Sequence, residues 1–125
     1  MTGPLRVIVN AVAGLGRRDP VPPIEEALAE AGVEAVVALV DPDGVGTAVA
    51  DGVRERVPLV AVAGGDGTLL TAAGQLGGTR TVLAPVPVGT LNHFARRLGL
   101  PDLAAAAMAI RDGFITTVPL GVMDD

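Results

Sequence analysis

Short apolar runs that alternate with helical segments are the feature that most constrains the fold of this 125-residue chain. The runs are rich in Val and Ala, and turn residues followed by helix-type spacing separate one run from the next. We expect strands at residues 5–10, 33–40, 58–63 and 81–88, and a last extended run at 114–120. We expect helices at residues 22–31, 45–56, 69–76, 91–98 and 101–110.

This order of elements predicts one α/β domain with a three-layer architecture. Strands that are apolar throughout are typical of a parallel sheet that is covered on both faces. We therefore expect a mainly parallel, Rossmann-like sheet with helices on both faces. Right-handed crossovers would place every strand-to-helix loop at one edge of this sheet, where ligands bind in such folds.

Composition excludes several classes of chemistry. All nine basic residues are arginine, so the chain has no lysine for a P-loop, a protein-kinase strand or a Schiff base. It has no cysteine for disulfides or thiol catalysis, and one histidine, His93, is too few for a multi-histidine metal site. The net charge of −5 argues against a nucleic-acid partner. Neither a membrane span nor a signal peptide is evident, so we expect a cytoplasmic protein.

The sequence AVAGGDGTLLTAAG contains the strongest candidate site, because it follows an apolar strand. Gly64, Gly65 and Gly67 can adopt positive φ and can let backbone N–H groups approach a ligand closely. The helix that follows offers a natural anion site at its N-terminus, where Thr68 can cap the helix or bind a phosphate. Asp66 would bind Mg²⁺ through water or orient a hydroxyl. The alternative is an Asp-Gly turn that only reverses the chain.

A second loop, PVPVGTLNHFARRLGLP, follows the next strand and repeats this arrangement. Gly89 and Thr90 lead into a helix, as the glycines of the first loop do. Asn92 and His93 fall in the first turn of that helix and can face the same crevice. Two roles are open to His93, that of a catalytic base and that of a surface or capping residue.

The loop after the first strand, VNAVAGLGRR, lies at the same predicted edge. It contains Asn10, Gly14 and Gly16, whose small side chains again allow close backbone approach. The arginine pairs at 17–18 and 96–97 would contact phosphate, an anionic membrane surface or only solvent. A peripheral membrane contact therefore stays open.

Together these motifs carry a family resemblance. The segments VN-x-x-AG-x-G, GGDGT and VGTLNHFARRLGLP, in this order and spacing, resemble the diacylglycerol kinase catalytic-domain family of bacterial lipid kinases and sphingosine kinases. The resemblance extends from Val7 to about Gly121. GGDGT is shared with NAD kinases, whereas GTLNHFARRLG is typical of the lipid-kinase-like branch.

The resemblance implies ATP and Mg²⁺ as cofactors and assigns residues to the nucleotide site. Asp66 is the candidate catalytic residue, and no metal ligand is assigned. The implied ATP-binding residues are Asn10, Gly14, Gly64, Gly65, Asp66, Gly67, Thr68, Leu69, Leu70, Gly89, Thr90 and Asn92.

By this resemblance, residues 1–113 form an ATP-binding domain and residues 114–125 begin a second, β-rich domain. The intact enzyme would transfer the γ-phosphoryl group of ATP to diacylglycerol or a related lipid, and we expect the 125-residue chain alone to lack this activity. The alternatives are a NAD-kinase-like phosphotransferase and a non-catalytic nucleotide-binding module. The apolar run at 114–120 has no helix after it, which predicts self-association or pairing with another domain.

Overall fold

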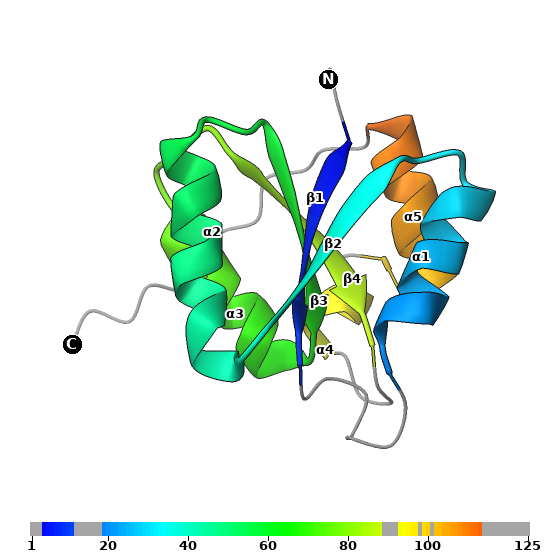
Figure 1. The fold of residues 1–125 in the computed structure, drawn as a ribbon, viewed down its shortest axis with the longest axis horizontal. Helices are drawn as coiled ribbons and strands as arrows, with labels where there is room; N and C mark the ends of the chain where they lie inside the picture. The colour runs from blue at the N-terminus through cyan, green and yellow to red at the C-terminus, as the bar shows by residue number, and fades with distance from the viewer. Residues whose placement is uncertain (1–3, 12–18, 89–92, 98, 101, 114–125) are drawn as a thin grey trace.

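The computed structural model, which describes residues 4–11, 19–88, 93–97, 99–100 and 102–113, alternates strands and helices along the chain (Figure 1). The strands are β1 (Leu5–Asn10), β2 (Ala35–Val40), β3 (Leu59–Gly64) and β4 (Val82–Pro87). The helices are α1 (Val21–Glu30), α2 (Val45–Arg54), α3 (Asp66–Leu76), α4 (His93–Arg97) and α5 (Leu103–Asp112), and a 3₁₀ turn, η1 (Pro42–Gly44), precedes α2.

The four strands form one parallel sheet in the order β2-β1-β3-β4. Helices α1 and α5 cover one face, and α2 and α3 cover the other (Figure 1). The predicted three-layer α/β fold is therefore confirmed. Among the described helices, none is both long enough and apolar enough to cross a membrane.

The central strands β1 and β3 supply both hydrophobic layers. Val7 and Val9 of β1 pack toward α1 and α5, whereas Ile8 packs toward α2 and α3. Val60 and Val62 of β3 are likewise buried in the second layer. Each buried Val or Ile side chain contributes about 1.5–3 kcal/mol relative to an exposed one. This double burial explains why both strands are apolar over most of their length.

Strand β2 departs from the expectation that every apolar run is buried on both faces. It is an edge strand of the described sheet, and the side chains of Val36 and Leu39 are 58% and 54% exposed. The apolar composition of residues 35–40 correctly predicts a strand. The position of that strand in the sheet decides how much of its surface the helices and neighbouring strands cover.

Two helices begin at residues other than those expected. Helix α3 begins at Asp66 rather than at 69, because the N–H of Leu69 donates to the carbonyl of Gly65 over 3.1 Å and so closes a helical turn that includes residues 66–68. Helix α5 begins at Leu103 rather than at 101. Its N-terminus is set by Asp102, whose carboxylate accepts a hydrogen bond of 2.9 Å from the backbone N–H of Ala105. The expected strand at 114–120 lies outside the described residues.

Candidate functional site

The carboxyl ends of β1 and β3 mark the point where the chain turns in opposite directions across the sheet. β1 connects through α1 to β2 on one side, whereas β3 connects through α3 to β4 on the other. In open α/β sheets, ligands bind in the crevice at such a switch point. Asn10 ends β1 and Gly64 ends β3, and the two strands pair directly up to Val9 and Ala63.

A hydrogen bond joins the two motifs at this point. The side-chain amide of Asn10 donates from Nδ2 to Oγ1 of Thr68 over 2.8 Å, across 58 residues of sequence. Asn10 is 7% exposed, so its amide lies largely out of water and depends on protein partners. Both residues were expected in the site from their motifs, but nothing in the sequence pairs one with the other.

Gly64 makes this contact sterically possible. A Cβ atom at Gly64 would lie 2.6 Å from both Cβ and Cγ2 of Thr68 and 2.8 Å from its Oγ1. Separations below 3.0 Å essentially never occur for real Cβ atoms. The first turn of α3 therefore rests directly on the backbone of Gly64, and this brings Thr68 within reach of Asn10.

The GGDGT loop does not use the positive φ that its glycines permit. Gly64 ends a strand, Gly65 is extended with φ −82° and ψ −172°, and Gly67 is helical. The described glycines that do have positive φ follow helices or end turns elsewhere, at Gly32, Gly78, Gly99 and Gly113. The glycines of the GGDGT motif therefore serve close approach and open space rather than an unusual backbone conformation.

Within the described residues, the two glycines of the first turn of α3 have free space beside them. A Cβ atom at Gly65 or at Gly67 would have no atom of a non-neighbouring described residue within 4 Å. The first N–H groups of an α-helix lack intrahelical acceptors, and the helix dipole places partial positive charge there. Helix α3 is 11 residues long, so this end can receive an anion such as a phosphate group.

Of the other expected site residues, the structure describes the side chains of Asp66, Leu69 and Leu70. The side chain of Leu69 is fully buried in the core, so only its backbone can contact a ligand, whereas Leu70 is 54% exposed. Helix α4 lies beside α3, and its Ala95 is buried in the same hydrophobic cluster as Leu69. The side chain of His93 is not described. Outside the described residues lie Gly14, Gly89, Thr90 and Asn92.

Asp66 is the candidate carboxylate of this site. Asp66 is partly buried in the first turn of α3. In the described part of the chain, no cluster of three or more acidic or histidine side chains could hold a metal ion. Mg²⁺ bound with a nucleotide needs only one or two protein carboxylates, because phosphates and water supply its remaining ligands. Asp66 therefore fits a nucleotide-bound Mg²⁺ and does not fit a metal held by protein alone.

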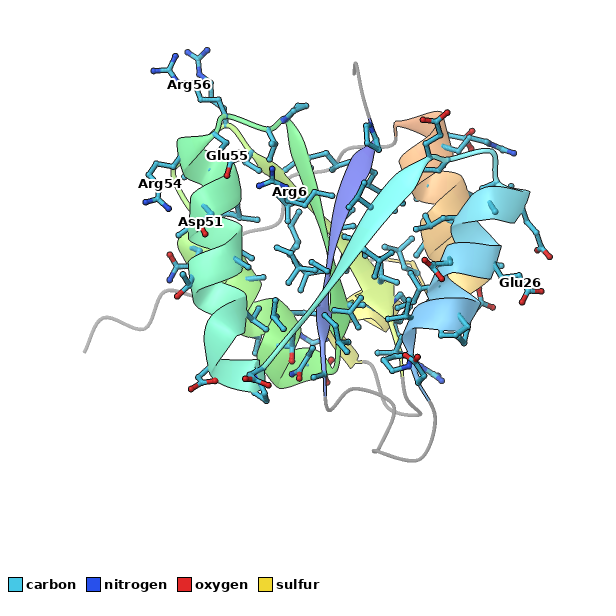
Figure 2. The ribbon with its side chains drawn as sticks, in the orientation of Figure 1. Arg6, Glu26, Asp51, Arg54, Glu55 and Arg56 are labelled. Carbon is cyan, nitrogen blue, oxygen red and sulfur yellow. The ribbon has the colours of Figure 1, made fainter. Side chains whose placement is uncertain are left out.

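Two ion pairs, one between β1 and the end of α2 and one within α2, lie at the opposite edge of the sheet. Arg6 reaches Glu55 over 2.7 Å, and Figure 2 shows the two side chains directed toward each other. The hydrogen bond from Arg6, and then its charge, lower the pKa of Glu55, and the same bond raises the pKa of Arg6. Arg54 pairs with Asp51 near this edge. A phosphate at the carboxyl edge would therefore rely on backbone N–H groups, hydroxyls and other arginines.

The family model of the diacylglycerol kinase catalytic domain matches residues 4–123, which is nearly the whole chain. The chain belongs to this family. Among curated members, a diacylglycerol kinase from Staphylococcus haemolyticus is 32% identical over 126 residues, covering 96% of this chain and 38% of its own length. A diacylglycerol kinase from Mycobacterium tuberculosis is 40% identical over 75 residues, covering 58% of this chain and 24% of its own length.

Solved structures of this family share the fold. A crystal structure of a diacylglycerol kinase from Bacillus anthracis superimposes with a TM-score of 0.66 at 30% sequence identity. The match covers 88% of this chain and 42% of the Bacillus anthracis chain. The chain thus spans less than half the length of these diacylglycerol kinases.

Proposed function

We propose that this chain is the ATP-binding part of a lipid kinase and that it binds ATP at the carboxyl edge of the sheet. The observation that carries the proposal is the hydrogen bond between Asn10 and Thr68, which holds the open N-terminus of α3 against the end of β1. Membership of the diacylglycerol kinase catalytic domain family supports a nucleotide as the ligand. Because the chain has no lysine, backbone N–H groups of α3 would take the main part in binding the phosphates.

Thr68 would act at the phosphates with a defined orientation. Its Oγ1 accepts the hydrogen bond from Asn10, so its own O–H can be directed toward a phosphate oxygen. Asn10 would therefore position the hydroxyl, and Gly64 would provide the space for it. The remaining proposed contacts are with Gly14, Leu70, Gly89, Thr90 and Asn92, together with the backbone of residues 64–69.

Mg²⁺ bound with ATP would neutralise negative charge on the phosphates. We place Asp66 as the carboxylate that holds the ion, directly or through water, because it lies in the first turn of α3. The acceptor would be the hydroxyl of diacylglycerol or a related lipid, in keeping with the names of the curated relatives. A lipid acceptor favours a cytoplasmic enzyme that contacts the membrane surface peripherally.

Calorimetric titration of ATP and Mg²⁺ into the 125-residue chain tests this proposal. Thr68→Val keeps the shape of the side chain but removes the hydroxyl. Hydrogen bonds to charged groups contribute about 1.5–3 kcal/mol, so we expect the affinity to fall by about tenfold or more. Thr71→Val is the matched control, because the exposed Thr71 hydroxyl donates to the carbonyl of Gly67 in its own helix.

Three outcomes separate the alternatives. ATP binding that Thr68→Val weakens and Thr71→Val does not would support the proposed site. Failure of the wild-type chain to bind ATP, or equal losses in both variants, would contradict it. Tighter binding of NAD than of ATP, with phosphorylation of NAD, would favour the NAD-kinase-like alternative.

A further inference from the structure

An apolar groove lies between the amino half of β4 and helix α5, away from the proposed nucleotide site. Its cavity measures about 300 Å³. That space is equivalent to about ten water molecules at roughly 30 Å³ each. The groove is formed largely by apolar side chains, among them Leu59, Val82, Leu83, Leu100, Ala109 and Ile110.

The backbone of β4 beside this groove can accept a further strand over a short length. The N–H of Val82 donates to the carbonyl of Pro58 over 3.0 Å, so it faces β3. Because successive residues of a strand alternate, the N–H and C=O of Leu83 point to the other side, along the outer edge of the described sheet. Pro85 and Pro87 share this orientation and have no N–H to offer. Strand pairing is therefore possible beside Leu83 and weakens toward Pro87.

Helix α5 ends at the wall of this groove. Gly113 lines the groove and has a φ of +68°, which ends the helix and redirects the chain. The next seven residues are FITTVPL, and these lie outside the described residues. In an extended conformation Phe114, Thr116, Val118 and Leu120 would share one face, and three of these four side chains are apolar like the lining of the groove.

We propose that residues 114–120 of the same chain dock in this groove as a short strand beside the amino half of β4. The segment is attached to the groove through Gly113, so its local concentration there is of the order of millimolar. A second copy at micromolar concentration competes poorly with such a tethered segment. The apolar run that predicts self-association from sequence would thus be covered within its own chain.

A single tryptophan reports on this docking. The chain has no Trp and no Tyr, so Phe114→Trp introduces the only strong fluorophore of the 125-residue protein. We expect blue-shifted emission and weak quenching by acrylamide, both independent of protein concentration. In the Phe114→Trp background, Ala109→Arg should block the groove, shift the emission to the red and raise the quenching constant several-fold.

Met108→Arg is the matched control on the same helix, because Met108 is 47% exposed and does not line the groove. It should leave the emission unchanged. Far-UV circular dichroism checks the fold of each variant; if Ala109→Arg does not fold, Ala109→Leu fills the groove with apolar atoms and should have the same effect on the tryptophan.

Some results would overturn the proposal. A tryptophan that is exposed at every concentration would show that the segment does not dock. Burial that appears only as dimers form in the analytical ultracentrifuge would assign the segment to a second copy. Burial that neither Ala109 variant alters would place the segment elsewhere on the protein.

Discussion

Replacing Gly64 with alanine isolates the steric requirement at the centre of the proposed site. The added Cβ would lie 2.6 Å from Cβ and Cγ2 of Thr68. The Cβ of Thr68 is attached directly to the backbone of α3, so relief requires the first turn of that helix to move. We expect this movement to break the hydrogen bond from Asn10, which spans 2.8 Å.

The magnitude follows from three contributions. Crowding in a packed region costs about 1–3 kcal/mol, and loss of the Asn10–Thr68 bond costs about 0.5–1.5 kcal/mol. Alanine restricts the unfolded chain more than glycine does, and this stabilises the folded variant by about 0.4–1 kcal/mol. Gly64→Ala should therefore lower the free energy of unfolding by about 2 kcal/mol, a substantial share of the roughly 5–15 kcal/mol typical of a domain.

Gly65→Ala is the control at the adjacent position. Gly65 has φ −82°, and a Cβ there would have no atom of a non-neighbouring described residue within 4 Å. Alanine is a poorer N-cap than glycine, but it also restricts the unfolded chain, and the two effects should cancel to within about 0.5 kcal/mol. Urea denaturation followed by far-UV circular dichroism measures both variants by linear extrapolation.

A double-mutant cycle with Thr68→Val completes the test. In the wild-type background Thr68→Val removes the hydrogen bond from Asn10, whereas in the Gly64→Ala background that bond is already broken. Thr68→Val should therefore lower the free energy of unfolding clearly less in the Gly64→Ala background than in the wild-type background. Equal stability of Gly64→Ala and Gly65→Ala, or strictly additive losses in the cycle, would refute the reasoning.

Three further predictions concern single residues. Asp102→Ala should cost about 1 kcal/mol in urea denaturation by removing the N-cap bond of α5, whereas Asp112→Ala should change little because its ion pair is exposed. Glu55→Gln should lower stability at neutral pH, because Arg6 lowers the pKa of Glu55 in the folded protein. The difference should disappear as the pH falls through that lowered pKa, which urea denaturation at a series of pH values measures. In a kinase that contains this segment, Asp66→Asn should keep the fold and reduce phosphoryl transfer by about 100-fold. Near-normal turnover of this variant would show that Asp66 has only a structural role in the first turn of α3.

Sequence alone determined the elements and the edge of the sheet where the motifs gather. The apolar runs predict strands whose ends differ from those of β1, β2, β3 and β4 by two residues or fewer. The reason is local: a strand buried on both faces must be apolar at every position, and turn residues must end it. The positions of Asn10 and of the GGDGT motif after strands follow from the same pattern.

Tertiary structure decided the features that depend on which elements become neighbours. β2 is as apolar as β1, yet Val36 and Leu39 are exposed because β2 lies at an edge of the described sheet. The sequence alone points to Gly64 as a residue that permits positive φ. In the structure, its lack of a side chain instead lets Thr68 approach the backbone. The bond from Asn10 to Thr68 joins residues 58 positions apart. No local pattern encodes such a contact, because its geometry is set by the pairing of β1 with β3 and the packing of α3.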